Sequence, residues 1–317
     1  MKQVEERYIS LLTDFGFKRI FGSAPNKDLL ICFLNSLFNG RQVVKDVKYL
    51  NPENVGDIYT DRKAIFDVYC EGENSEKFIV EMQNAYQTYF KDRALFYSTF
   101  PIREQAPKGS EWDFKLNHVY TIALLNFNMN EDAFNKEEIR HHVQLCDTAT
   151  HKIFYDKLEF IYVEIAKFNK SLDELDTLYD KWLYALKNLY KLTQRPKALC
   201  DKVFDRLFEE AEIARFTPQE QREYEASKMA YRDIKNSIDT AKREGKEEGL
   251  AEGMEKGLAE GMEKGLAEGM EKGLAEGMER GMTQRSLEIA RKMLANGMDA
   301  ATVMEITGLS AEQLELK

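Results

Sequence analysis

Hydrophobic and polar positions follow two different rhythms in the first 127 residues. The segment "NKDLLICFLNSLF" repeats apolar residues every three or four positions, which predicts a helix over residues 26–38. Asn26 is a suitable cap at its start, and Asn39-Gly40 is a stop signal at its end. Four segments rich in β-branched and aromatic residues predict strands: "VVKDVKYL" (43–50), "KAIFDVYC" (63–70), "KFIVEMQ" (77–83) and "HVYTIALLNF" (118–127).

A second helix is expected between the third and fourth of these strands. In "TYFKDRALFYSTFPI" the aromatic residues and Leu95 recur at helical spacing until Pro101, where we expect the helix to end. After Phe127, "HHVQLCDT" and "EFIYVEIAKF" predict two further strands. From "LDELDTLYDKWLYALKNLY" onward, and past Pro218, helical periodicity dominates. The pattern therefore predicts an α/β fold with the order helix, three strands, helix, strand, followed by a helical C-terminal region.

An octamer repeat interrupts the helical half. "GLAEGMEK" occurs three times from Gly249 and a fourth time as "GLAEGMER", so we call residues 249–280 the octamer array. Glu-to-Lys pairs four residues apart contribute about 0.2–0.5 kcal/mol each, whereas each Gly costs about 0.8–1 kcal/mol relative to Ala. An isolated helix should therefore be marginal. A four-residue period drifts by about 40° per step around a helix, so no straight seam forms. Either a linker or a self-association element fits this pattern.

The last 34 residues change character again. An amphipathic helix up to Asn296-Gly297, a second over residues 300–306, and the segment "SAEQLE" give the outline of a helix-turn-helix, with Ser310 as a cap. The segment "GLSAEQLELK" would have to serve as the recognition helix, yet Lys317 is its only cation. This composition favours a partner-binding or capping role. Four parts are predicted: 1–170, an α/β core with a strand extension; 171–244, helical; 245–283, repeat linker; 284–317, helical tail.

Composition and charge narrow the class of protein. The net charge of −10 argues against simple coating of nucleic acid, but residues 1–127 hold 16 Lys and Arg against 17 Asp and Glu, so a basic surface there remains available. The four cysteines and four histidines show no metal-ligand spacing. No signal-type apolar segment or run of about 18 apolar residues occurs, so we expect a cytoplasmic protein without a membrane partner.

Two acidic residues interrupt otherwise apolar strands. In "IFDVYCEGENSEKFIVEMQ", Glu81 and Gln83 share one face of their strand, and an even hairpin register would bring Asp67 within cross-strand reach of Glu81. Like charges at this spacing are destabilising unless a cation such as Mg²⁺ lies between them. The alternative is that both acids lie on a solvated face. The apolar neighbours disfavour that alternative because they make the strands look central.

The chain resembles a known family through three segments: "LLTDFGFKRIFG", "FDVYCEGENSEKFIVEMQ" and "YFKDRALFYSTF". An Asp in one strand and Glu-x-Gln in the next, within an αβββαβ order, resemble the PD-(D/E)XK nuclease superfamily with its restriction-endonuclease-like core. More specifically, these segments resemble the recombination-promoting nuclease, or putative transposase, family of bacteria. The tail "IARKMLANGMDAATVMEITGLSAEQLE" is similar to the usual C-terminal ending of that family.

The resemblance implies roles for several residues. Asp67 and Glu81 match the metal-binding acids for Mg²⁺ or another divalent cation, and Gln83 stands where the superfamily more often has Lys. An amide can orient a water or a phosphate but cannot take a proton or supply a charge. Asp14 matches an N-terminal acidic position, as a third carboxylate or a helix cap. The expected substrate contacts are Lys18, Arg93 and Tyr97.

The function that the resemblance implies is metal-dependent DNA endonuclease activity, linked to recombination, mobile elements or phage defence. The alternative function is that of an interaction or regulatory protein, in which the nuclease fold is catalytically inactive and the octamer array and tail bind partners. A helix-turn-helix regulator would require sequence-specific binding by residues 284–317. Besides DNA, the expected partners are a second copy of the chain or a C-terminal fragment translated from Met254, which follows codons that must be purine-rich.

Overall fold

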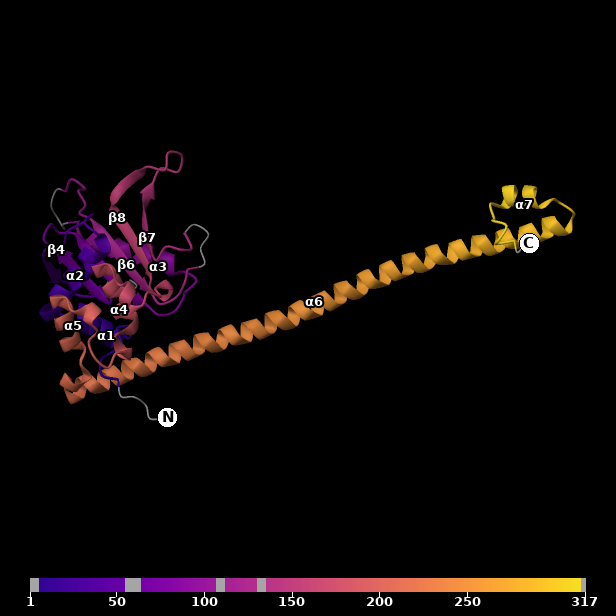
Figure 1. The fold of residues 1–317 in the computed structure, drawn as a ribbon. Helices are drawn as coiled ribbons and strands as arrows, with labels where there is room; N and C mark the ends of the chain where they lie inside the picture. Colours follow the sequence, from indigo (N-terminus) through magenta and orange to yellow (C-terminus); the bar gives the residue numbers. More distant parts are fainter. Residues whose placement is uncertain (1–5, 55–63, 107–111, 130–134, 315–317) are drawn as a thin grey trace. The chain divides into compact units, whose positions relative to one another are not determined.

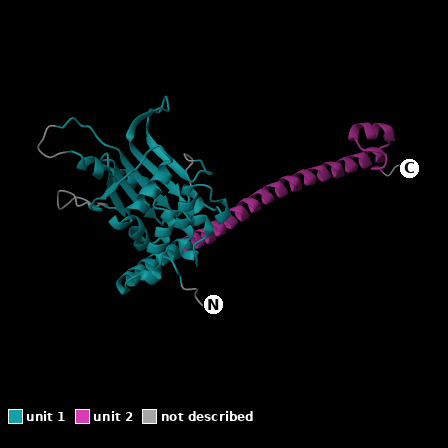
Figure 2. Cartoon of the chain, turned by 60° about the vertical axis from the view of Figure 1, so that its left-hand side comes forward, with its two compact units in different colours: residues 1–239 teal, residues 240–317 magenta. Residues whose placement is uncertain are grey.

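The computed structural model describes residues 6–54, 64–106, 112–129 and 135–314 (Figure 1). The chain forms two compact units, residues 1–239 and residues 240–317 (Figure 2). The long helix α6 (Pro218–Ala295) begins in the first unit and continues into the second.

A six-stranded mixed sheet forms the centre of the first unit. In spatial order its strands are β1 (Val47–Tyr49), β4 (Val68–Gly72), β5 (Lys77–Gln83), β6 (Val119–Leu125), β8 (Ile153–Glu164) and β7 (Arg140–Cys146). Strands β5, β6 and β8 run parallel to one another, and the remaining pairs are antiparallel. A separate two-stranded sheet consists of β2 (Glu53–Asn54) and β3 (Ala64–Ile65).

Helices cover both faces of this sheet. The hydrophobic core on one face joins it to α1 (Asp14–Phe21), α2 (Lys27–Phe38), α4 (Leu178–Asn188) and α5 (Lys202–Ala211). Helix α3 (Phe90–Glu104) packs on the other face through two smaller clusters. Short 3₁₀ turns lie at Ala24–Asn26, Ile165–Lys167, Leu172–Glu174, Leu189–Lys191, Lys197–Leu199 and Ile213–Arg215. The succession α2, β1, β4, β5, α3, β6 confirms the expected restriction-endonuclease-like order.

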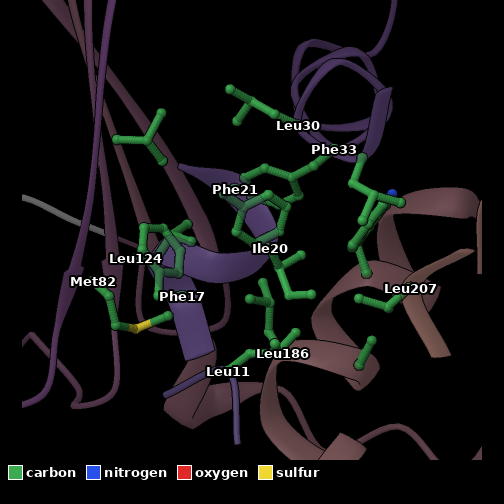
Figure 3. Packing of buried hydrophobic residues seen from close by; sticks show 14 of the residues in the cluster. Leu11, Phe17, Ile20, Phe21, Leu30, Phe33, Met82, Leu124, Leu186 and Leu207 are labelled. Atoms are coloured by element: carbon green, nitrogen blue, oxygen red, sulfur yellow. The ribbon is translucent and has the colours of Figure 1, made fainter. Parts of the chain in front are cut away.

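The main core combines residues from distant parts of the sequence. Phe21 of α1 and Phe33 of α2 have ring centroids 5.2 Å apart, and both rings lie within 6 Å of Trp182 from α4. Figure 3 shows Met82 and Leu124 from the sheet in the same cluster as Leu186 and Leu207 from the later helices. The predicted helical region after residue 171 therefore shares one core with the sheet.

The predicted helix over residues 26–38 is confirmed. It runs over Lys27–Phe38, and Asn39 closes it in the left-handed conformation at φ 49°. As the amphipathic pattern predicts, one face of α2 is buried: six of its apolar residues lie in the core. The Asn26 side chain does not cap α2; its amide instead donates a hydrogen bond to the Arg19 carbonyl.

The prediction of one continuous strand over residues 63–70 was wrong. Residues Phe66 and Asp67 separate β3 from β4, and Asp67 lies in a bend just before β4. The Phe66 amide donates to the Pro52 carbonyl, while the Asp67 carboxylate accepts from the Met82 amide. A side chain thus takes the place of a backbone partner, which ends the strand pairing at this point.

The prediction that Pro101 ends the second helix was also wrong. Helix α3 continues through Pro101 to Glu104, although a proline inside a helix removes one backbone donor. Phe100 and Pro101 are both buried. Packing of this turn against the sheet outweighs the local signal.

The second unit contains the rest of α6 and the helix α7 (Ala300–Thr307). Asp299 caps α7 through the Thr302 amide, and Gly308 ends it at φ 71°. Ala290, Val303 and Leu309 form a small buried cluster. Ser310 and Gln313 exchange hydrogen bonds in the expected capping pattern. The octamer array is helical throughout, as part of α6.

In the part of the chain that the structure describes, no helix is both long enough and apolar enough to cross a membrane.

Candidate active site

Asp67 and Glu81 lie close together at the end of the β4–β5 pair. The pairing ends at Val68 and Val80, and the next residues, Asp67 and Glu81, are near enough for the Asp67 charge to raise the pKa of Glu81. Asp67 Oδ2 accepts a hydrogen bond of 2.9 Å from the Met82 amide. Burial is the largest influence on this carboxyl and raises its pKa, while the Met82 amide and the Lys18 ammonium act in the opposite direction. We call these two residues and their charged neighbours the carboxylate site.

Glu81 is the more buried of the two acids, with 8% of the residue exposed. Its position in β5 points its side chain to the face that α3 covers, because the neighbouring Val80 and Met82 belong to the core on the opposite face. Burial and, to a lesser degree, the Asp67 carboxylate raise the pKa of Glu81 to about 8. Glu81 Oε1 is buried and has no hydrogen-bond partner. Such an orphan acceptor is costly unless a ligand satisfies it.

Gln83 connects Glu81 to Arg93. Its Nε2 donates to Glu81 Oε2 at 2.9 Å, and its Oε1 accepts a hydrogen bond from the Arg93 guanidinium of α3. Both ends of the amide are therefore engaged within the protein. Arg93 also donates to Gln87 Oε1 at 2.8 Å and lies 3.9 Å from Glu81 Oε2.

Lys18 approaches the site from α1. Its Nζ lies 2.7 Å from Asp14 Oδ1 and 3.9 Å from Asp67 Oδ1. Thr13 caps α1 through the Gly16 amide, so Asp14 is not the cap and that alternative was wrong. The Asp14 side chain is 64% exposed, and its charge raises the pKa of Asp67.

Tyr97 lies one helical turn after Arg93. Its ring is 5.8 Å from the guanidinium carbon and 5.4 Å from the Phe66 ring. Burial, and then the nearby Glu81 carboxylate, raise the pKa of this phenol, so it remains a hydrogen-bond donor at neutral pH. The structure thus brings all seven predicted residues into one neighbourhood, with Asp14 at its edge.

The donor set fits a hard divalent cation. Among the described residues no group of three or more His, Cys, Asp and Glu side chains is arranged to hold a metal ion. Mg²⁺ is commonly held by only one or two carboxylates, with waters and substrate phosphates as its other ligands. Asp67 and Glu81 supply two carboxylates, and the orphan Glu81 Oε1 supplies an acceptor without another partner.

Three supporting residues were not foreseen from the sequence. Asn126 donates from its backbone to the Gln83 carbonyl at 2.8 Å, and its side chain reaches Tyr231 Oη at 3.1 Å. Asn84 donates to the Leu12 carbonyl at 2.7 Å. Only the position of Asn84 directly after Glu-x-Gln could have drawn attention to it, because the other contacts join segments far apart in the chain.

The mixed sheet carries two acids at the end of neighbouring strands, and helix α3, which carries Arg93, covers this face. This arrangement defines a nuclease-type fold of the restriction-endonuclease class. Comparison with known families gives the same result. Residues 11–241 match the model of the PD-(D/E)XK nuclease family transposase, and the chain belongs to this family. Residues 283–316 match the C-terminal HTH domain of the Rpn/YhgA-like nuclease family. Neither the curated proteins nor the solved structures give a match.

Proposed function

We propose that this protein is an endonuclease that hydrolyses DNA phosphodiester bonds with the help of a divalent cation. The observation that carries the proposal is the neighbouring pair Asp67 and Glu81, in which the buried Glu81 Oε1 lacks a hydrogen-bond partner. The chain belongs to a nuclease family, which supports hydrolysis of a phosphodiester over other reactions of a metal-carboxylate site.

Asp67 and Glu81 would hold Mg²⁺ or a similar cation. When bound, such a cation lowers the pKa of its water and stabilises negative charge on the phosphate. The side chains of the protein perform the remaining tasks. Lys18 lies 3.9 Å from Asp67 Oδ1 and Arg93 lies 3.9 Å from Glu81 Oε2, so each can donate a hydrogen bond to a phosphate oxygen. Tyr97 can donate a hydrogen bond to the same group, and Asp14 fixes Lys18 in place.

Gln83 cannot act as a general base because an amide does not accept a proton at neutral pH. We expect Gln83 to have a positioning role. It either orients the attacking water and the scissile phosphate, or it holds its two charged neighbours, Glu81 and Arg93, in place. A bound cation would lower the pKa of its water, so that the proton could pass to solvent without a basic side chain at position 83.

The test is cleavage of supercoiled plasmid with Mg²⁺, compared between the wild-type protein and the Asp67→Asn and Glu81→Gln variants. Each substitution keeps the shape of the side chain and removes its charge, so cleavage should fall at least about 10²-fold. A matched control is Glu260→Gln in the octamer array, which should leave the rate unchanged. EDTA should abolish the wild-type activity.

Activity that survives both carboxylate substitutions would contradict the proposal. A wild-type protein that never cleaves DNA with Mg²⁺, Mn²⁺ or Co²⁺ would favour the idle-fold alternative. The setting of the reaction, whether recombination, mobile elements or phage defence, also belongs to this proposal. It can be tested by phage plating on cells that carry the wild-type gene or the Asp67→Asn variant.

A further inference from the structure

Position 83 leaves the carboxylate site without the positive charge that a lysine there would provide. The amide of Gln83 is neutral, and its oxygen is directed at Arg93 rather than at open space. The Arg93 guanidinium therefore lies just beyond the end of the Gln83 side chain. A lysine at position 83 that extended in the same direction would place its ammonium close to this guanidinium, because its chain is only slightly longer.

We propose that Arg93 supplies the catalytic positive charge of the site and that Gln83 is the residue that positions it. This inference rests on the proposed nuclease function and assigns different roles within the same site. The chain of contacts runs from Glu81 Oε2 through the Gln83 amide to the Arg93 guanidinium. The amide has one donor end and one acceptor end, so it can bind an anion and a cation at the same time. A lysine could not do this.

Three contacts fix the guanidinium in place. Gln83 and Gln87 accept from its two terminal nitrogens, and the Tyr97 ring lies 5.8 Å from its central carbon. A planar guanidinium with several donors can keep these contacts and still offer further N–H groups to a phosphate oxygen. Because arginine stays protonated at every physiological pH, it stabilises charge and does not transfer a proton.

Lys18 is the other cation at the site, but its contacts differ. Its ammonium pairs with the exposed Asp14 at 2.7 Å and lies 3.9 Å from Asp67, on the α1 side. Among the described residues no hydrogen bond or ion pair joins it to Glu81 or Gln83, and its charge lowers the pKa of Glu81 less than that of Arg93 does. Lys18 is therefore suited to balance Asp67, whereas Arg93 occupies the place of the missing lysine charge.

A charge-transplant experiment tests this assignment. Arg93→Gln should reduce plasmid cleavage with Mg²⁺ by about 10²–10³-fold, the range for loss of one group that stabilises the transition state. Gln83→Lys alone should also be defective, because it sets an ammonium beside the guanidinium. The double variant Gln83→Lys/Arg93→Gln should recover activity to within about tenfold of the wild-type rate.

Two controls separate this role from a structural one. Gln83→Lys should not rescue Lys18→Gln, since Lys18 lies beside Asp67 whereas the Gln83 amide contacts Glu81 and Arg93. Arg103→Gln removes an exposed charge from the last turn of the same helix and should have no effect. Thermal melting of each variant shows whether the fold is kept, and a recovered rate in the double variant cannot come from a misfolded protein.

A second measurement keeps the assignment independent of turnover. Binding of a short DNA duplex in Ca²⁺, followed by fluorescence anisotropy, should weaken in Arg93→Gln and recover in the double variant. Loss of activity in Arg93→Gln without recovery of either rate or binding would overturn the assignment. A wild-type protein that binds DNA but does not cleave it would instead overturn the proposed nuclease function, while the binding series still decides the role of Arg93.

Discussion

The sheet-centred unit and the octamer array contain the same apolar residue types but use them in opposite ways. Leu186 of α4 is fully buried, among side chains from α1, α2 and the sheet. Leu258 of the octamer array is 67% exposed, and every residue from 239 to 282 is exposed. A hydrophobic core forms only where apolar faces from several elements meet. In the octamer array the four-residue period distributes the leucines and methionines around a single helix, so no apolar face forms.

The same comparison extends to polar groups. Ionisable side chains of the carboxylate site are fixed by neighbours from α1, β5 and α3, and burial changes their protonation. The acids of the octamer array lie on an exposed helix, where ion pairs contribute little. Tertiary packing therefore converts common residues into a chemical site in one unit and leaves them as a solvated surface in the other.

Truncating one leucine in each region tests the contrast most strongly. Leu186→Ala removes buried methyl groups and leaves a cavity, so it should lower the free energy of unfolding by about 2–5 kcal/mol. Leu258→Ala should change it by less than about 0.5 kcal/mol. Urea denaturation followed by circular dichroism measures both. A loss above about 1 kcal/mol for Leu258→Ala would be too large for an exposed side chain. It would mean that the array packs against a partner surface.

The pH dependence of the free energy of unfolding should also differ between a glutamate in the sheet-centred unit and one in the octamer array. The pKa of Glu81 is raised from 4.5 to about 8, so the folded protein holds a proton that the unfolded chain releases at lower pH. Stability from this group is complete below pH 4.5 and declines as the pH rises to about 8, by about 1.4 kcal/mol for each pH unit. Glu81→Gln should remove this slope in the metal-free protein, and Glu260→Gln in the array should retain it. Identical slopes in the wild-type protein and Glu81→Gln would refute the buried, protonated Glu81.

A cation competes with the same proton. Binding of Mn²⁺ should therefore strengthen as the pH rises from 6 to about 8, with release of a proton that calorimetry in buffers of different ionisation enthalpy can detect. Glu81→Gln should abolish both the binding and the proton release. Binding that is independent of pH would place the cation elsewhere.

Adding a methyl group to one glycine in each region gives the smallest effects, of opposite sign. At Gly16 of α1 a Cβ would lie 2.1 Å from the Ser10 carbonyl oxygen, so Gly16→Ala should destabilise the protein by about 1–3 kcal/mol. At Gly261 no atom lies within 4 Å, so Gly261→Ala should stabilise the helix by about 0.8–1 kcal/mol. Circular dichroism during thermal melting measures both.

The second glycine substitution also sharpens the question of self-association. If the array is a linker, Gly261→Ala should raise its helicity and leave the sedimentation behaviour of the chain unchanged. If the glycines allow a second helix to approach closely, the added methyl group should weaken an oligomer that analytical ultracentrifugation can detect.

Local sequence determined most elements of the fold. The apolar spacing of residues 27–38 and the left-handed Asn39 define α2, and the strand β5 has the bounds that "KFIVEMQ" predicted. Local signals failed at Pro101, where burial of Phe100 and Pro101 outweighs the missing backbone donor. They failed again at Asp67, because a strand pattern does not show that a side chain will take the place of a backbone partner.

The sequence by itself determined which residues could carry the chemistry, since apolar neighbours mark Asp67 and Glu81, and the resemblance to the nuclease family points to Lys18 and Arg93. Only the tertiary structure decided how they combine. The pairing of β4 with β5, which ends at Val68 and Val80, brings Asp67 beside Glu81, and the packing of α3 on the sheet brings Arg93 to the Gln83 amide. The physical reason is that a motif records residue types and spacing, whereas burial, hydrogen-bond direction and charge pairing depend on segments that meet only in the folded chain.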